Sequence, residues 1–230
     1  MSENNSLVDY IRTFPMMTRD RNLDHEQIQA FFTGIDLDAI LGEHKEFLQI
    51  GCGKGNVARQ MAAKYGGVPY GVDLSDYRDP SQIQEATLRF IVGNAEHLPY
   101  DNEKFDFVFS FMTHRYIGDK LQALKEIHRV MKLGTTAIID FAATDNINWT
   151  ETGIDPTIET ILRYLPNNNQ LTIDKITIPN GEYSEPLTCY RMTINKTSRN
   201  TLEFPSLIQE PEFNFLSMVV TSIYDRNFIW

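Results

Sequence analysis

A glycine-rich turn is the first feature of this 230-residue chain whose residue types point to chemistry, and it reads Gly51-Cys52-Gly53-Lys54-Gly55. The turn follows the apolar run Phe47-Leu48-Gln49-Ile50 and precedes a segment with helical spacing. Glycines allow a tight turn and a close approach of a ligand to the backbone, and amides at a helix start hold polar groups. The turn therefore predicts a small-molecule site, with an ordinary strand-to-helix turn as the alternative.

A carboxylate follows the glycines at a distance that suits a nucleoside. Asp73 ends the next apolar run, roughly 20 residues beyond Gly51, which is the spacing found in dinucleotide sites. A carboxylate there accepts hydrogen bonds from both hydroxyls of a ribose. Spacing alone leaves open a second reading, in which Asp73 caps a turn with Ser75.

The elements that must position these residues alternate along the chain. Apolar runs typical of strands lie at 47–50, 68–72, 88–92, 105–111, 136–141, 171–178 and 187–195. Helical spacing lies at 24–41, 57–64, 119–131 and 156–165, and Gly134 is expected to cap the third of these helices. Strands alternating with helices are typical of a parallel sheet in the α/β class. The last two strands alternate in polarity and are expected to pair across Asn180-Gly181.

The amino-acid composition limits the kinds of molecule that we expect this chain to bind. The net charge of −10 favours a small-molecule substrate over nucleic acid. No apolar run reaches the ~20 residues of a membrane helix, and the start of the chain does not resemble a secretory signal, so we expect a cytoplasmic protein that makes no membrane contact. Cys52 and Cys189 lack neighbours at zinc-ligand spacing, so no metal is expected.

Four motifs in order resemble those of class I S-adenosylmethionine-dependent methyltransferases, in particular the ubiquinone/menaquinone-biosynthesis-like (methyltransferase type 11) branch. They are Phe47 to Gly55; Gly71-Val72-Asp73-Leu74-Ser75; Gly93-Asn94-Ala95-Glu96-His97-Leu98-Pro99-Tyr100 followed by Phe105 to Ser110; and Leu121 to Met131 followed by Lys132-Leu133-Gly134. The resemblance implies a Rossmann-like, doubly wound, mostly parallel seven-stranded sheet with an antiparallel final hairpin.

The resemblance also implies S-adenosyl-L-methionine as cofactor and gives each motif a part in binding it. Gly51, Gly53 and Gly55 would face the methionine portion and the ribose. Asp73 would hold the ribose hydroxyls, with Leu74 against the adenine, Asn94 and Ala95 at the adenine edge, and Ser110 and Phe111 on the floor near the sulfonium.

Three positions depart from the family pattern. Gln49 stands where the family has Asp or Glu, so a charge-assisted contact to the methionine ammonium becomes a neutral one. Asn94 replaces the usual Asp at the adenine amino group, and its amide oxygen still accepts that hydrogen bond. Leu133 replaces the proline of a turn.

The candidate catalytic residues follow the fourth strand. Alignment of nucleophile and methyl group supplies much of the rate, and an oxygen nucleophile also needs a base. Where the family often has two histidines, this chain has Arg115 and Tyr116. His114, one position earlier, is the first candidate base and Tyr116 the second; a packed or solvated histidine is the alternative for His114.

Three segments are expected. Residues 1–23 would form an N-terminal segment, residues 24–196 the methyltransferase domain, and residues 197–230 an extension packing on the domain or on a second subunit in a possible homodimer. The resemblance implies a lid over the cofactor, to which Tyr10, Arg12, Phe14 and Met17 would contribute; a loosely ordered terminus is the alternative.

The predicted function is methylation of a small-molecule acceptor at oxygen, nitrogen or carbon, with secondary metabolism as a possible setting. The alternative is a domain that binds S-adenosylmethionine or S-adenosylhomocysteine without methyl transfer, which Gln49, Asn94 and the Arg115-Tyr116 pair motivate. A nicotinamide-dependent oxidoreductase would share the glycines and the acid but not the 93–110 motif.

Overall fold

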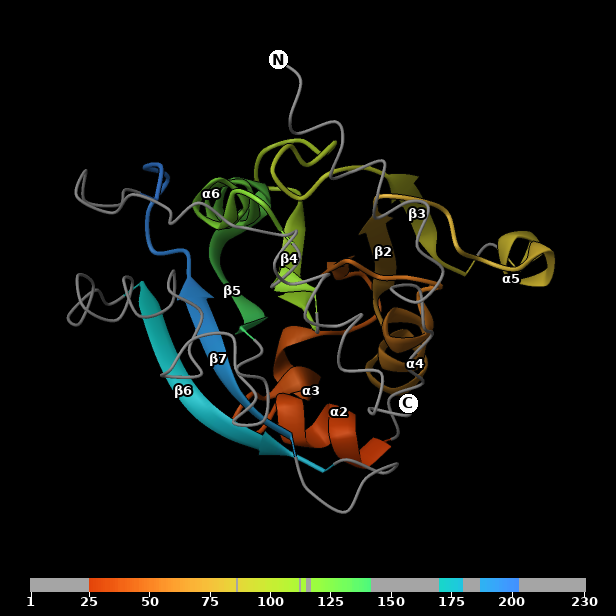
Figure 1. Ribbon diagram of the computed structural model, residues 1–230, viewed down its shortest axis with the longest axis horizontal. Coiled ribbons are helices and arrows are strands. Elements are labelled where there is room, and N and C mark those ends of the chain that lie inside the picture. Colours follow the sequence, from red (N-terminus) through yellow and green to blue (C-terminus); the bar gives the residue numbers. More distant parts are fainter. Residues whose placement is uncertain are drawn as a thin grey trace, which may run out of the picture.

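The computed structural model describes residues 25–85, 87–111, 113–114, 117–141, 170–179 and 187–202. Its helices are α2 (His25–Phe31), α3 (Leu37–Ile40), α4 (Asn56–Tyr65), α5 (Pro80–Gln84) and α6 (Lys120–Val130). Its strands are β1 (Glu46–Ile50), β2 (Val68–Asp73), β3 (Arg89–Val92), β4 (Phe105–Ser110), β5 (Met131–Phe141), β6 (Leu171–Ile178) and β7 (Leu187–Asn195). Figure 1 shows α6 on the opposite side of the sheet from α2 and α3, and α5 standing away from the body.

The strands form one seven-stranded sheet in the order β3-β2-β1-β4-β5-β7-β6. The first five strands of that order pair in parallel, and β7 pairs antiparallel with both β5 and β6. The strand order reverses between β1 and β4, where Ile50 lies opposite Ser110. Open α/β sheets bind ligands outside the carboxyl ends of the strands at such a reversal. The predicted α/β class, the parallel sheet and the final antiparallel pair are confirmed.

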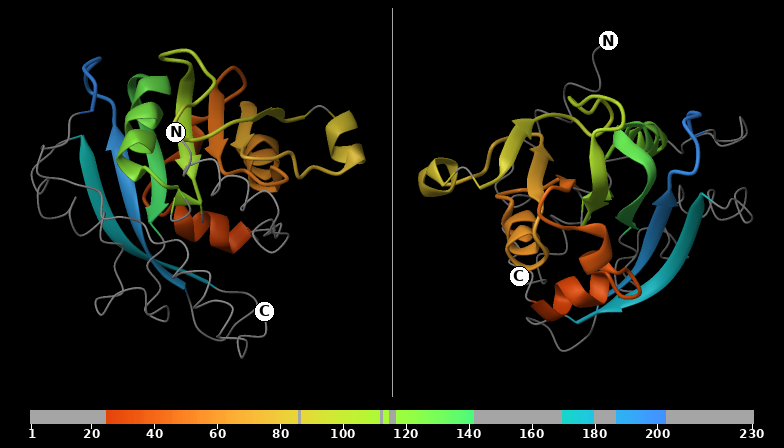
Figure 2. Two further views of the ribbon diagram at one scale, coloured as in Figure 1. Left: turned by 45° about the horizontal axis from the view of Figure 1, so that its top comes forward. Right: turned by 180° about the vertical axis from the view of Figure 1, so that it is seen from behind.

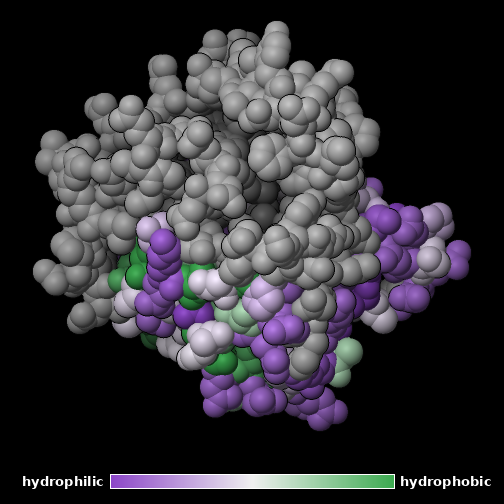
Figure 3. Space-filling view, turned by 60° about the horizontal axis from the view of Figure 1, so that its bottom comes forward, coloured by the Kyte–Doolittle hydropathy of each residue, from purple (hydrophilic) through white to green (hydrophobic). Residues whose placement is uncertain are grey.

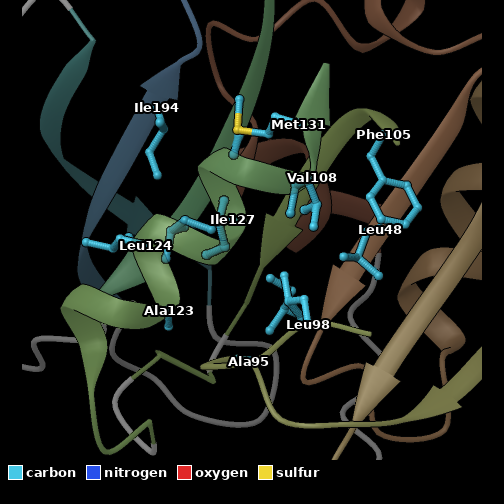
Figure 4. Packing of buried hydrophobic residues seen from close by; sticks show 14 of the residues in the cluster. Leu48, Ala95, Leu98, Phe105, Val108, Ala123, Leu124, Ile127, Met131 and Ile194 are labelled. Carbon is cyan, nitrogen blue, oxygen red and sulfur yellow. The ribbon is translucent and has the colours of Figure 1, made fainter. Parts of the chain in front are cut away.

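The central strands are covered on both faces. All six residues of β4 are buried, as the apolar run predicts for a strand between two layers. Val108 packs in the core under α6, which Figure 4 shows with Leu124 and Ile127 pointing toward the sheet. Phe107 and Phe109 pack in the second core, with residues of α2, α3 and α4. Packing on both faces holds the carboxyl ends of β1 and β4 in fixed positions.

The helix predicted over 24–41 is wrong in its continuity, because the described part forms two shorter helices. Gly34, between α2 and α3, has φ +78°, which a right-handed helix does not allow. Asp36 then caps α3, its side chain accepting a hydrogen bond from the Ala39 N–H at 3.0 Å. A glycine followed by an N-cap residue ends one helix and starts the next.

The helix cap predicted at Gly134 is also wrong. α6 ends at Val130, and β5 begins at once with Met131, so Gly134 lies inside a strand. Gly134 has φ +81° there and donates its N–H to the Lys196 carbonyl at 2.8 Å. The pairing of β5 with β4 shifts register in this region. The glycine therefore accommodates an irregularity of the strand, not a helix cap.

The last two strands are attached to the first described helix. The Arg191 guanidinium on β7 donates to the carbonyls of Phe31 and Thr33, at 2.8 and 2.7 Å, where α2 ends. Gln27 of α2 donates to the Pro179 carbonyl at 2.9 Å, just after β6. Figures 1 and 2 show the curved strands β6 and β7 passing beside α2. These contacts join residues about 150 positions apart in sequence.

The described surface in Figure 3 is mostly hydrophilic, with smaller hydrophobic areas. Within the described ranges, no helix is long and apolar enough to span a membrane, and no three His, Cys, Asp or Glu side chains converge as metal ligands. Leu202 is buried in the core under α6, so the first residues of the expected 197–230 extension pack on the domain. The expected lid, the 156–165 helix, the Asn180-Gly181 turn and the chain from 203 onward lie outside the described residues.

Candidate functional site

Three glycines after β1 adopt backbone conformations that other residues rarely adopt. The φ angles are +63° at Gly51, +53° at Gly53 and +78° at Gly55. The Gly51 N–H donates to the Val72 carbonyl at 2.8 Å, which ties the turn to the end of β2. A Cβ on Gly51 would overlap the Thr113 side chain, whereas a Cβ on Gly53 would meet no described residue within 4 Å. Gly53 therefore offers an open stretch of backbone that a ligand can approach.

Gln49 lies on β1 just before this turn, and it is 4% exposed. Its Oε1 accepts a hydrogen bond from the Ala58 N–H at 3.0 Å. Ala58 is in the first turn of α4, whose N-cap residue is Gly55 and so has no side chain that could cap the helix. Gln49 therefore satisfies a helix amide that a Ser or Asp cap would otherwise satisfy. This contact holds α4 against β1.

Asp73 ends β2, and two backbone amides hold its carboxylate. Oδ2 accepts from the Gly53 N–H and Oδ1 from the Leu74 N–H, both at 2.7 Å. Burial raises the pKa of Asp73, and these two hydrogen bonds oppose that rise. Each oxygen has a further lone pair, so the oriented carboxylate can accept two hydroxyl groups of a ligand.

The loop after β3 lies next to Asp73. The Gly93 N–H donates to the Asp73 carbonyl at 2.9 Å, and Asn94 forms an isolated bridge with His97. The Asn94 side-chain oxygen accepts from the Glu96 N–H at 3.0 Å, and Ala95 is buried in the core under α6. The two residues predicted at the adenine edge therefore sit at the same edge of the sheet as Asp73.

The continuation of this loop is fixed on α6. Glu126 accepts a hydrogen bond from the Leu98 N–H at 2.8 Å. Arg129 donates to the carbonyls of Leu98 and Tyr100, at 3.0 and 2.8 Å, and pairs with Glu126 at 2.7 Å. Hydrogen bonds to charged groups are among the stronger ones. The helix therefore helps to position this part of the loop.

Ser110 and Phe111 follow each other at the end of β4, and their side chains belong to opposite faces of the sheet. Ser110 pairs with Ile50 on one side and Ile139 on the other, and both isoleucines lie in the core under α6. The buried Ser110 hydroxyl has no hydrogen-bond partner among the described residues. The Phe111 ring packs edge-on against Phe31, with centroids 4.7 Å apart, in the core on the α2 side.

His114 follows β4 and is fully buried. Burial lowers its pKa well below 6.5, and the positive charge of Lys120 lowers it further. Its imidazole is therefore neutral at pH 7, which is the form that accepts a proton. Lys120 is itself buried and donates to the Ile117 carbonyl at 3.2 Å. The second candidate base, Tyr116, lies outside the described residues, as does Arg115.

The structure thus brings most of the predicted cofactor residues to one edge of the sheet. Hydrogen bonds or strand pairing link Gly51, Gly53, Asp73, Leu74 and Ser110 to this edge, and Asn94 directly follows Gly93, which donates to the Asp73 carbonyl. Thr113 and Glu96 also contact it, and sequence reasoning did not select either as a site residue. Glu96 stands inside the quoted 93–100 motif, which was the available signal, whereas nothing in the sequence marks Thr113.

The donors and acceptors at this edge fit S-adenosylmethionine. A carboxylate that is fixed by amides, with lone pairs remaining, suits the two ribose hydroxyls. The open backbone at Gly53 suits a ligand lying directly on the turn. The unpartnered Ser110 hydroxyl at the strand reversal gives a polar atom at the floor.

Comparison with known proteins agrees with this arrangement. Residues 48–139 match the family model described as a methyltransferase domain. An ajmaline N-methyltransferase of Rauvolfia serpentina is 28% identical over 137 residues, which cover 55% of this chain and 46% of that protein. A 2-phytyl-1,4-naphtoquinone methyltransferase of Nostoc punctiforme is 31% identical over 109 residues, covering 43% and 47%.

The fold also matches solved structures. A methyltransferase dependent on S-adenosylmethionine, from Aquifex aeolicus, superposes with a TM-score of 0.53 at 16% identity, covering 75% of this chain and 94% of that one. The chain spans about half the length of the two curated relatives. The shared region contains the glycine turn, Asp73, the 93–100 loop and β4.

Proposed function

We propose that this chain, whose residues 48–139 match the methyltransferase domain model, is a class I S-adenosylmethionine-dependent methyltransferase that transfers a methyl group to a small-molecule acceptor. The observation that carries the proposal is the Asp73 carboxylate, held by the Gly53 and Leu74 amides beside the strand reversal. A carboxylate fixed in this way is ready to bind a ribose before the ligand arrives, which lowers the entropy cost of binding.

We assign the remaining cofactor contacts to residues at the same edge of the sheet. We assign Leu74 and Ala95 to the adenine, with the Asn94 amide at its polar rim, and the turn at Gly51, Gly53 and Gly55 to the methionine portion. Ser110 and Phe111 would flank the reacting end. Gln49 lies next to the turn, but its Oε1 already binds the Ala58 amide, so its contribution to a methionine ammonium would be shared with the helix cap.

Bound S-adenosylmethionine supplies a methyl group on a sulfonium, so the protein must chiefly align the acceptor with it and exclude water. His114 is the candidate that takes a proton from a hydroxyl or ammonium acceptor. Its neutral imidazole has the required lone pair, and Lys120 helps to keep it neutral. Tyr116 is the second candidate.

The proposed class of methyl acceptor is supported by the net charge of the chain and by its sequence similarity to two curated relatives. A net charge of −10 disfavours a phosphate-rich substrate, and the two curated relatives are named for small-molecule acceptors. We propose an oxygen, nitrogen or carbon acceptor on a metabolite, in secondary metabolism, acted on in the cytoplasm.

The test is a two-stage measurement on the full chain. Calorimetric titration with S-adenosylhomocysteine should give saturable binding with one site per chain, and titration with NADH should give none. Radiolabelled S-adenosylmethionine is then incubated with phenol, quinol and amine acceptors, and label should appear in an acceptor. Absence of any binding to S-adenosylhomocysteine would overturn the proposal.

A second candidate function is binding of the cofactor or its product without methyl transfer. The use of Gln49 as a helix cap favours it, because a neutral, already bonded amide replaces a carboxylate at the methionine end. Tight binding of S-adenosylhomocysteine with no label transfer to any acceptor class would support this function over catalysis.

A further inference from the structure

The loop predicted to bind adenine is attached to the start of α6 through one side chain. The Glu96 carboxylate oxygen Oε1 accepts hydrogen bonds from the N–H groups of Gly118 and Asp119, at 3.2 and 3.1 Å. The Gln122 side chain returns a hydrogen bond to the Glu96 carbonyl at 3.3 Å. The same Glu96 donates its own N–H to the Asn94 side chain. Glu96 therefore joins the adenine edge of the site to residues 118–119.

Thr113, next to His114, contacts the other side of the site. The Thr113 hydroxyl lies 3.2 Å from the Gly51 carbonyl and 3.2 Å from the Phe111 carbonyl. Its side chain occupies the space in which a Cβ of residue 51 would lie. The segment that carries His114 is thus connected at its beginning to the glycine turn and at its end, through Glu96, to the 94–98 loop.

The attachment at Glu96 is electrostatically favourable. Asp119 is the N-cap of α6, and its side chain accepts from the Gln122 N–H at 2.8 Å, so the helix starts directly after the two amides that Glu96 binds. A negative carboxylate beside a helix N-terminus interacts favourably with the helix dipole. The His114 carbonyl accepts from the Ile117 N–H at 3.1 Å, and Ile117 is buried in the core under α6. Ile117, directly before the two amides that Glu96 binds, is therefore joined to His114 by a hydrogen bond.

From these contacts we infer that Glu96 is a positioning residue that couples occupancy of the cofactor site to the placement of the His114 segment. The inference rests on the proposed function, since it takes the 94–98 loop as the adenine edge. When a nucleoside immobilises Asn94 and Ala95, Glu96 is held with them, and its two hydrogen bonds fix the start of α6. Thr113 holds the His114 segment in the same way, through its hydrogen bond to the Gly51 carbonyl in the glycine turn.

The experiment measures amide hydrogen exchange by NMR at Gly118 and Asp119, in the full chain with and without S-adenosylhomocysteine. In the unliganded protein, Glu96→Ala should speed exchange of both amides about tenfold, the effect of losing one hydrogen bond to a charged group. Glu96→Gln should restore slow exchange, because the amide oxygen still accepts both hydrogen bonds. In the wild type, S-adenosylhomocysteine should slow exchange of these amides, and in Glu96→Ala it should not.

Glu126→Ala is the matched control. It removes the hydrogen bond at Leu98, on the same loop and the same helix, but Glu126 has no bond to the 118–119 amides. Glu126→Ala should lower stability, but S-adenosylhomocysteine should still slow amide exchange at Gly118 and Asp119 in this variant. If Glu96 had a purely structural role, the Glu96→Ala and Glu126→Ala variants would respond to the ligand alike. Equal slowing by ligand in wild type and Glu96→Ala would overturn the inference.

Calorimetry on the same samples separates the two proposals. If the wild type fails to bind S-adenosylhomocysteine, the proposed function and the coupling both fail, while the unliganded comparison of Glu96→Ala with Glu96→Gln still decides whether Glu96 holds the segment. If ligand binds and the amides of Gly118 and Asp119 do not respond, the proposed function stands and the coupling is wrong.

Discussion

The two ends of the parallel sheet handle charge in opposite ways. At the amino end, Asp106 accepts hydrogen bonds from Lys45, Lys132 and the Glu46 N–H, at 3.2, 2.8 and 3.0 Å. Burial opposes ionisation of Asp106, but these partners outweigh it and lower its pKa. At the carboxyl end, the Asp73 carboxylate forms no ion pair with the described cations and is held by two amides alone.

Glu46 extends the network at the amino end. It accepts from Lys104 at 2.8 Å and from the Tyr70 hydroxyl at 2.6 Å. Burial again opposes ionisation, and the hydrogen bonds from Lys104 and Tyr70 lower its pKa. The amino end thus satisfies its charges internally, whereas burial dominates at Asp73 and raises its pKa. The difference teaches that, among these three carboxylates, Asp73 keeps bonding capacity at the end where the strand order reverses and where a ligand can use it.

The largest effect is expected from adding a methyl group at the glycine turn. Gly51→Ala should lower the free energy of unfolding by about 3 kcal/mol, because the new Cβ overlaps Thr113 at a positive φ. Gly53→Ala is the matched control, with a positive φ but no described neighbour within 4 Å, and should cost about 1 kcal/mol. Urea unfolding measures both.

The same two variants also separate an effect on stability from an effect on ligand binding. Gly53→Ala should weaken binding of S-adenosylhomocysteine more than its small effect on stability implies, because the methyl group enters the open side of the turn. Equal losses of stability in the two variants would show that Thr113 does not pack on Gly51 as described.

A pair of acidic substitutions tests the two ends directly. Asp106→Ala should lower the free energy of unfolding by about 2 kcal/mol, since it breaks hydrogen bonds among charged groups. Asp73→Ala should have a smaller effect on stability and should weaken binding of S-adenosylhomocysteine by about 1–3 kcal/mol. Calorimetry and urea unfolding on both variants complete the comparison. If Asp106→Ala weakened binding as much as Asp73→Ala, the division between the two ends would be wrong.

A third prediction concerns pH. The pKa of His114 is lowered in the folded protein, so below pH 6.5 the unfolded chain binds a proton that the folded protein does not. Stability should therefore fall as the pH falls from about 6.5 to about 5, by up to about 1.4 kcal/mol per pH unit for each such group. The pKa of His128 is lowered by burial, and then by Lys196, and contributes in the same direction.

Urea unfolding at several pH values measures this slope. His114→Gln should flatten it and leave the contribution of His128. A slope that His114→Gln does not alter would mean that His114 is not the buried neutral group described.

The sequence predicted three central strands well because each is a local apolar run with a clear end. The runs at 47–50, 68–72 and 105–111 correspond to β1, β2 and β4 within one or two residues. The start of β5, predicted at residue 136 and found at Met131, was harder, because it depends on partners elsewhere. Glycine is the residue type that commonly caps a helix, but Gly134 lies in β5. Its N–H donates to the carbonyl of Lys196, which is 62 residues further along the chain.

Within the candidate site, the sequence by itself determined the glycine turn and the acid after the next strand. Steric demands on a tight turn and the spacing of a βαβ unit are local, so they can be read from residue types. Only the tertiary structure decided what Gln49 and Glu96 do. Gln49 caps α4 from β1, and Glu96 binds amides more than 20 positions away, at the start of α6. A polar side chain acts on whichever backbone group the fold brings within about 3 Å, and that neighbour is set by the packing of the whole sheet.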